Sequence, residues 1–122
     1  MSAKKILVVE DSLYQRKNIV KNLSEWGHHV EQAGNGVEAL KVLESYTPDV
    51  ILSDLLMPEM DGFGLLEKLR EKGSKIPVVV LSADIQSSVR DQCSGLGAKD
   101  FLSKPVDKVK LKQCLVSILG AF

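Results

Sequence analysis

The chain has 122 residues, of which 44% are hydrophobic and 26% are charged; this length fits one globular domain and excludes disordered, collagenous and disulfide-scaffold proteins. Sixteen Lys and Arg balance sixteen Asp and Glu, so binding to nucleic acid or to an anionic membrane has no electrostatic basis and neither partner is expected. No apolar run approaches the roughly 18 residues of a transmembrane helix, and the start lacks the apolar segment of a signal peptide, which predicts a cytoplasmic protein.

Short apolar runs alternate with longer amphipathic stretches along the whole chain. Runs rich in β-branched residues predict strands that are covered on both faces of a sheet. In chain order, the expected strands are residues 6–9, 28–33, 49–53, 77–81 and 98–102. The second run is weaker and more polar, which is typical of a strand at the edge of a sheet.

A helix is expected after each strand, because capping residues and chain breakers bracket the amphipathic stretches. Ser12, with Gln15 three positions later, has the pattern of a capping box, and the helix that it starts should end at Gly27. Asn35 should cap the second helix, which should end at Thr47 and Pro48. The later helices should end near Gly73, near Gly95 or Gly97, and beyond Ile118.

Five strands that alternate with five helices form a (βα)₅ pattern. This alternation implies a parallel sheet with right-handed crossovers, which place helices on both faces. Five units are too few for an eight-stranded barrel, so we predict an open, doubly wound α/β sheet. Such sheets bind ligands at the carboxyl ends of their strands, where the strand order reverses.

Reactive side chains stand at these strand ends. Glu10 and Asp11 follow the first strand, Asp54 the third, Ser82 the fourth and Lys104 the fifth. Clustered carboxylates raise one another's pKa unless a cation compensates, and Mg²⁺ accepts one or two of them while leaving room for phosphate oxygens. Since Lys104 adds a point charge and Ser82 a hydrogen-bond donor, the set predicts a site for phosphoryl transfer.

Four motifs resemble those of receiver domains in two-component response regulators, particularly the single-domain receivers of chemotaxis and phosphorelays. They are residues 6–11, Asp54 with Met57, Pro58 and residues 60–62, residues 81–83, and Lys104 with Pro105. The resemblance covers essentially the whole chain, so it implies one receiver domain over residues 1–122 without an output domain. It also implies a flavodoxin-like sheet with the strand order 2-1-3-4-5.

The resemblance implies a role for each acidic residue. Asp54 would accept a phosphoryl group from the phosphohistidine of a sensor histidine kinase or a phosphotransfer protein. Mg²⁺ would be held directly by Asp11 and Asp54, through water by Glu10, and by the backbone carbonyl of Leu56. The chain would then catalyse only its own phosphorylation and dephosphorylation, and it would not be an enzyme in the usual sense.

The resemblance also implies a conformational switch. Ser82 would bond a phosphoryl oxygen, and Lys104 would pair with Asp54 before transfer and with the phosphoryl group afterwards. Phe101 would be the switch aromatic, and the surface of residues 86–122 would control a downstream effector protein or a phosphatase. The peptide bond after Lys104 is expected to be cis. The oligomeric state stays open.

Two flanking residues are less typical of the family. Leu56, two positions after Asp54, is apolar where many members are polar, and Asp84, two after Ser82, is acidic. We expect Leu56 to impede the water that removes the phosphoryl group and Asp84 to help orient that water. The two effects oppose each other, so the sequence predicts no lifetime for the phosphorylated state.

Three other functions fit the sequence less well than a receiver. A phosphatase of the dehalogenase type would need Asp-x-Asp after the first strand, where this chain has Glu10, Asp11 and Ser12. A flavodoxin-like FMN carrier would need an anion-accepting loop there, and two carboxylates would repel the cofactor phosphate. A degenerate receiver that signals without phosphate would lack part of the reactive set, and here every position is filled.

Four other side chains have structural interpretations. Cys93 and Cys114 match no metal or redox spacing and are expected to be reduced thiols that fill apolar space. His28 and His29 fall at the start of the second strand, away from the reactive edge, and are expected to be solvated.

Overall fold

The computed structural model describes residues 3–84 and 86–120. The outermost residues of the expected domain and of the expected switch surface, together with residue 85, lie outside this part. The strands are β1 (Lys5–Val9), β2 (His29–Ala33), β3 (Val50–Asp54), β4 (Val78–Ser82) and β5 (Asp100–Ser103). The helices are α1 (Leu13–Glu25), α2 (Gly36–Val42), α3 (Gly62–Glu71), α4 (Ser87–Gly95) and α5 (Lys108–Leu119).

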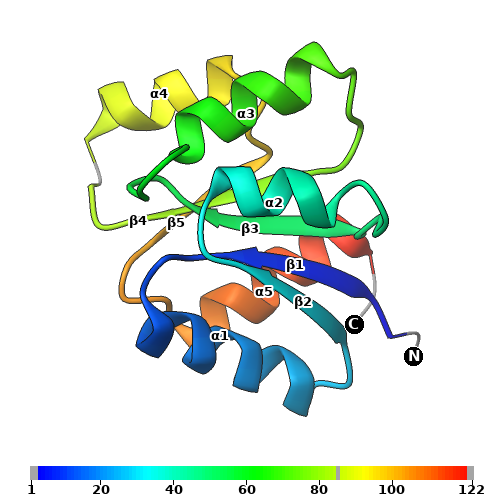
Figure 1. Ribbon diagram of the computed structural model, residues 1–122. Helices are drawn as coiled ribbons and strands as arrows, with labels where there is room; N and C mark the ends of the chain where they lie inside the picture. The colour runs from blue at the N-terminus through cyan, green and yellow to red at the C-terminus, as the bar shows by residue number, and fades with distance from the viewer. Residues whose placement is uncertain (1–2, 85, 121–122) are drawn as a thin grey trace.

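The five strands form one parallel sheet in the order β2-β1-β3-β4-β5, which confirms the predicted doubly wound fold. Figure 1 shows α1 and α5 on one face of this sheet and α2, α3 and α4 on the other. The chain runs outward from β1 to β2 and then returns to pair β3 on the opposite side of β1. The order therefore reverses between β1 and β3, and a doubly wound sheet binds its ligands at such a point.

Alternation along the buried strands divides the core into two layers. Ile6 and Val8 of β1 pack with α1 and α5, whereas Leu7 and Val9 pack with α2, α3 and α4. Because successive side chains of a strand point to opposite faces, each central strand contributes to both layers. This double covering makes the middle of the sheet a rigid platform for the residues at its carboxyl edge.

Ser12 and Asn35 cap the first two helices as predicted, but the capping box at Ser12 is incomplete, because the Ser12 N–H bonds the Glu10 carboxylate and not the Gln15 side chain. The Ser12 hydroxyl accepts the backbone N–H of Gln15 (3.3 Å), and the Asn35 side chain accepts that of Glu38 (2.9 Å). The second helix ends at Val42, well before the predicted end at Pro48, because the chain turns directly after its cap. None of the helices in residues 3–84 and 86–120 is long and apolar enough to cross a lipid bilayer.

Strand boundaries differ from the prediction at both edges of the sheet. β3 and β4 each run one residue further, through Asp54 and Ser82, because both residues still pair with neighbouring strands. β5 starts two residues later than predicted. The reason is that Ala98 still belongs to the end of α4, where its N–H donates to the Cys93 carbonyl (2.9 Å) after Gly97 at φ +99°.

The prediction of a solvated His28 is wrong. Its ring is buried, and its Nδ1 accepts the backbone N–H of Lys4 (3.1 Å). Burial, together with the charge of Lys4, lowers the pKa of His28 below its ordinary value. His29 is exposed as expected, and its ring lies 3.1 Å from the Tyr46 hydroxyl.

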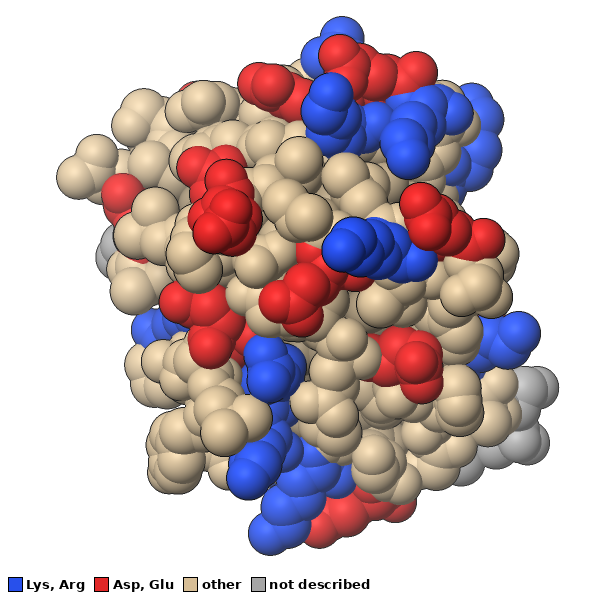
Figure 2. Space-filling model, in the orientation of Figure 1, with Lys and Arg blue, Asp and Glu red and all other residues tan. Residues whose placement is uncertain are grey.

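The charged side chains are dispersed. Figure 2 shows small groups of acidic and basic side chains separated by uncharged surface on the face that it draws. This mixture agrees with the zero net charge, and on that face it offers no broad basic area for a polyanion.

Candidate functional site

The sheet brings three acidic residues to one place. Glu10 and Asp11 directly follow β1, and Asp54 is the last residue of the neighbouring strand β3. One carboxylate oxygen of each lies within 4.8 Å of the others. The site therefore occupies the carboxyl edge at the point where the strand order reverses, as the sequence predicts.

Asp54 is buried, and both of its carboxylate oxygens have a partner. It is 7% exposed, its Oδ1 accepts the N–H of Leu55 (2.8 Å), and its Oδ2 lies 3.0 Å from Nζ of Lys104. Gly62 donates its N–H to the Leu55 carbonyl (2.8 Å), and a Cβ on Gly62 would lie only 2.4 Å from the Asp54 carbonyl oxygen. The backbone after β3 thus folds back tightly onto the main chain of Asp54 and Leu55 and holds it in place.

Lys104 joins two buried carboxylates. Its ammonium lies 2.5 Å from Oε1 of Glu10 as well as 3.0 Å from Asp54, and its side chain is only 14% exposed. The other oxygen of Glu10 accepts the N–H of Ser12 (3.2 Å). The pairing of Glu10 with Lys104 was not predicted, although their opposite charges at two strand ends were a signal for it.

The pKa values of Glu10 and Lys104 are shifted by burial and by the contacts of these two groups with each other and with Asp54. Burial raises the pKa of Glu10 to about 7, and the Asp54 carboxylate adds to this effect while Lys104 and the Ser12 N–H oppose it. Burial would lower the pKa of Lys104, but its hydrogen bonds to Glu10 and Asp54 outweigh this, so that the pKa is raised. The ammonium is therefore kept charged beside Asp54.

Ser82 lies at the same edge, at the end of β4, and is buried. Its hydroxyl oxygen accepts the N–H of Asp84 (3.0 Å), and the Asp84 carboxylate accepts the N–H of Gln86 (3.0 Å). The bond from Asp84 uses one acceptor site of the Ser82 hydroxyl and leaves the hydroxyl proton available for donation. The Lys104 backbone N–H donates to the Ser82 carbonyl (2.9 Å), whereas among the described residues the Ser82 hydroxyl has no hydrogen bond to Asp54 or to Lys104.

The other predicted residues lie around this centre. Leu56, two residues after Asp54, is 76% exposed. Phe101 is half-buried on β5, and the guanidinium carbon of Arg90 lies 5.2 Å from the centre of its ring, a cation–π contact that the sequence analysis missed. The peptide bond after Lys104 is cis, as expected.

The donor set fits a magnesium ion. All three carboxylates offer oxygen, the donor that Mg²⁺ prefers, and their 4.8 Å spread is close to the about 4.2 Å that separates opposite ligands of an octahedral Mg²⁺. Asp11 is exposed, which leaves room for the several waters that Mg²⁺ retains. Since Glu10 is already bonded to Lys104, its carboxylate suits contact with the ion through water.

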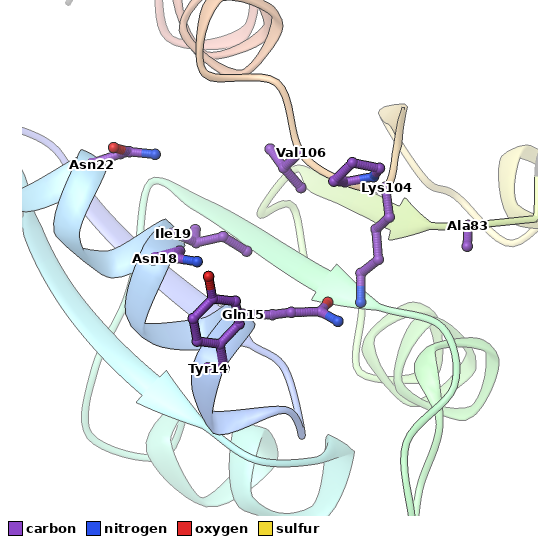
Figure 3. A pocket seen from close by; sticks show the side chains of 9 residues that line it. Tyr14, Gln15, Asn18, Ile19, Asn22, Ala83, Lys104 and Val106 are labelled. Atoms are coloured by element: carbon purple, nitrogen blue, oxygen red, sulfur yellow. The ribbon is translucent and has the colours of Figure 1, made fainter.

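An apolar groove of about 540 Å³ lies beside the site. One wall consists of Tyr14, Gln15, Asn18, Ile19 and Asn22, and the other of Ala83, Lys104, Pro105 and Val106. Figure 3 shows the α1 side chains on one side of it, with Lys104 and Val106 across from them. The groove thus leads from open surface to the ammonium that contacts Asp54.

The family model of the response regulator receiver domain matches residues 6–116 of this chain. The sensor histidine kinase RcsC of Salmonella typhi is 38% identical over 110 residues, which are 90% of this chain and 12% of that protein. Response regulator MprA of Mycobacterium ulcerans is 41% identical over 103 residues, 83% of this chain and 44% of that protein. The chain therefore spans less than half the length of these curated relatives.

Solved structures share the same fold. The receiver domain of a signal transduction histidine kinase from Syntrophus aciditrophicus has a TM-score of 0.86 and 38% identity, over 97% of this chain and 91% of that one. The receiver domain of sensor histidine kinase PA1611 from Pseudomonas aeruginosa has a TM-score of 0.87 and 27% identity, over 98% of this chain and 100% of that one. The latter has a magnesium ion coordinated in its active site cleft.

Proposed function

The chain belongs to the response regulator receiver domain family, and from this premise we propose that it is switched by phosphorylation of Asp54. The observation that carries the proposal is the environment of this carboxylate. Asp54 ends a buried strand where the strand order reverses, lies 3.0 Å from a charged ammonium, and shares an acidic cluster with Glu10 and Asp11. These are the parts that phosphoryl transfer needs around its acceptor.

The chemistry is a nucleophilic displacement at phosphorus. A carboxylate oxygen of Asp54 forms a bond to the phosphorus as the P–N bond of a phosphohistidine breaks, and the electron pair of that bond stays on the imidazole. Lys104 pairs with Asp54 before the transfer and with the phosphoryl oxygens after it. Its ammonium already contacts the carboxylate, so little rearrangement is needed for it to follow the new charge.

We propose Mg²⁺ as the cofactor. Asp11 and Asp54 would bind it directly, Glu10 through water, and the backbone carbonyl of Leu56 would complete the protein ligands. When bound, the ion would neutralise charge on the phosphoryl oxygens. Support comes from the oxygen donors gathered within 4.8 Å and from the magnesium ion in the related PA1611 receiver domain.

The conformational change that follows phosphorylation would start at Ser82. On phosphorylation its hydroxyl would donate to a phosphoryl oxygen, and the loop that it shares with Asp84 would move with it. Phe101, half-buried next to α4, would change its rotamer as this loop moves and so alter the surface formed by α4, β5 and α5. Such a change is a shift between two populated states, which a phosphoryl group favours by its contacts in one of them.

Two kinds of protein partner follow. The phosphodonor is a histidine kinase or a phosphotransfer protein, and we propose that it docks in the groove between α1 and the residues after β5, because this groove reaches Lys104. The second partner is an effector protein or a phosphatase that distinguishes the two states of the switch surface. We place these events in the cytoplasm, where the free thiols of Cys93 and Cys114 would stay reduced.

The test is incubation with acetyl phosphate, followed by intact mass measurement, with Mg²⁺ and with a chelator. We expect the chain to gain one phosphoryl group only when Mg²⁺ is present. Asp54→Ala should gain none, whereas Asp91→Ala, a matched change of an exposed aspartate on α4, should behave as the wild type. A phosphoryl gain in Asp54→Ala would show that another residue is the acceptor.

A further inference from the structure

We propose that Arg16 is a positioning residue of this site, whose guanidinium holds the turn formed by Glu10 and Asp11 and thereby sets the affinity for Mg²⁺. The inference rests on the proposed function, because it assigns to the acidic cluster the ion named above. It concerns a residue outside the reactive set, on the first turns of α1. The observation behind it is the juxtaposition of a largely covered guanidinium with the backbone that carries two of the carboxylates.

The side chain of Arg16 reaches back from the helix to the end of β1. Its Nη1 donates to the backbone carbonyl of Glu10 (2.8 Å), while its backbone N–H donates to the Ser12 carbonyl in the first turn of α1 (2.9 Å). One residue thus ties the start of the helix to the end of the strand. Only Glu10, Asp11 and Ser12 lie between these two elements.

The position of Asp11 depends on the backbone that Arg16 holds. On its two sides, the Glu10 N–H donates to the Ala33 carbonyl (3.0 Å) and the Ser12 N–H donates to the Glu10 carboxylate (3.2 Å). The carboxylate of Asp11 itself is exposed, and among the described residues it has no hydrogen-bond partner. Its direction is therefore set by the backbone, and the bond from Arg16 to the preceding carbonyl is one of the few that fix this backbone.

Arg16 also contacts the turn after β2. A Cβ on Gly34 would lie 3.3 Å from Nη1 of Arg16 and 3.2 Å from Oε2 of Glu38, so Arg16 fits against a backbone that has no side chain at that point. Glu38 in turn accepts the N–H of Gly34 (3.1 Å). The guanidinium therefore fills the space between α1, the end of β1 and the β2–α2 turn.

Among the described residues, no ion pair offsets the unfavourable burial of part of the Arg16 side chain. Its Nε is buried without a hydrogen-bond acceptor, and no carboxylate lies within 4 Å of the guanidinium, in both cases among the described residues. Burying an incompletely bonded charged group is unfavourable. The contact that the guanidinium does make is the one to the Glu10 carbonyl, which is the contact of a positioning residue.

If Arg16 acted through its charge, its removal would have the opposite effect on Mg²⁺ affinity from the effect expected if it positions the turn. A cation beside a metal site repels the metal, so if Arg16 acted by charge, its removal would tighten Mg²⁺ binding. If Arg16 holds the turn, its removal loosens Asp11 and weakens binding. Partners that orient the ligands of a metal change its affinity by about 10- to 100-fold when they are mutated, and the lower end of this range suits a contact to a backbone carbonyl.

The experiment is a calorimetric titration of the whole chain with Mg²⁺. Arg16→Met keeps the apolar stem and removes every donor, and we expect it to weaken binding about tenfold. Lys17→Met removes the same charge from the neighbouring, exposed position of α1 and should stay within about twofold of the wild type. Arg16→Lys, which keeps the charge but loses the planar fork, should resemble Arg16→Met.

A second readout separates positioning from stability. The phosphorylation rate of Arg16→Met with acetyl phosphate should fall at low Mg²⁺ and return close to the wild-type rate at saturating Mg²⁺. If Arg16→Met does not fold, Arg16→Lys takes its place in both measurements. Unchanged or tighter Mg²⁺ binding by a folded variant overturns the role of Arg16 alone, whereas a wild-type chain that binds no Mg²⁺ overturns the proposed function itself.

Discussion

The two sides of the carboxyl edge are built differently. Every residue of β3 is buried, and its terminal Asp54 is held by a backbone N–H and by Lys104. On the other side, no residue of β5 is fully buried, and α4 starts without a side-chain cap and buries only Cys93 among its described residues. The proposed chemistry thus lies on the rigid side and the proposed switch on the loosely packed side.

This difference has a physical meaning for signalling. Groups that transfer a phosphoryl group must be held in place before the reaction, and dense packing provides this. Elements that move on activation come from the parts of a protein with little buried apolar contact, because little free energy opposes their motion. A receiver therefore needs both kinds of region, joined by a short connection such as the Ser82 loop.

The largest effect should come from removing the cation of the rigid side. Lys104→Met leaves Glu10 and Asp54 buried without their counter-charge, and we expect it to lower the free energy of unfolding by about 3 kcal/mol. Lys108→Met, which breaks an exposed contact of 4.0 Å to Glu25, should cost under about 1 kcal/mol. Urea unfolding of both variants measures the contrast. Equal losses would show that the site is not the more tightly held region.

The tightness of the backbone packing against Asp54 can be tested by adding a methyl group at Gly62. Gly62→Ala would place a Cβ 2.4 Å from the Asp54 carbonyl, so the backbone must shift, and we expect a loss of about 1–3 kcal/mol together with slower phosphorylation. Gly95→Ala, in α4, meets nothing within 4 Å and should be neutral or stabilising by up to about 1 kcal/mol. Unfolding curves and phosphorylation rates check both. A harmless Gly62→Ala would contradict the tight closure.

Much of this molecule could be predicted from its sequence, because buried parallel strands have a strong apolar signal. The predicted strands stop one residue short at Asp54 and Ser82, since apolar character ends before strand pairing does. The strand order followed from the family resemblance alone. His28 was wrongly placed in solvent because a polar side chain that bonds a neighbouring backbone N–H can be buried.

The contacts within the site were harder to predict. Glu10 and Lys104 are 94 positions apart, and their contact depends on the bend of the chain after β5 as well as on the strand order. The bond from Arg16 to the Glu10 carbonyl depends on how α1 leaves the strand. Apolar periodicity carries no information about such side-chain paths, so the sequence predicts which groups gather and not how they pair.

A smaller effect is expected on the loosely packed side. The contact between Arg90 and Phe101 should contribute about 0.5–1 kcal/mol, the usual value for an exposed cation–π pair. A double-mutant cycle with Arg90→Gln and Phe101→Leu, measured by urea unfolding, should return a coupling energy of this size. A coupling of several kcal/mol would mean that β5 and α4 are held as firmly as the site, and the contrast between the two sides would fail.

The smallest effect concerns the opposite edge of the sheet, where His28 is buried. Because its pKa is lowered in the folded chain, the unfolded chain binds more protons between the folded pKa and the ordinary value of 6.5. The stability due to neutral His28 is therefore fully present above about pH 6.5 and decreases as the pH falls through this window. Protonation of Nδ1 would also break its bond to the Lys4 N–H.

The variant His28→Asn keeps a side-chain acceptor near Nδ1 and removes the titration. Between pH 7.5 and pH 5.0, its free energy of unfolding should fall less than that of the wild type, whereas His29→Asn, at the exposed neighbouring position, should follow the wild type. Urea unfolding at several pH values measures these slopes, and the carboxylates common to all three chains cancel in the differences. An identical slope in His28→Asn would mean that His28 can be protonated without cost, which would require the start of β2 to open to water.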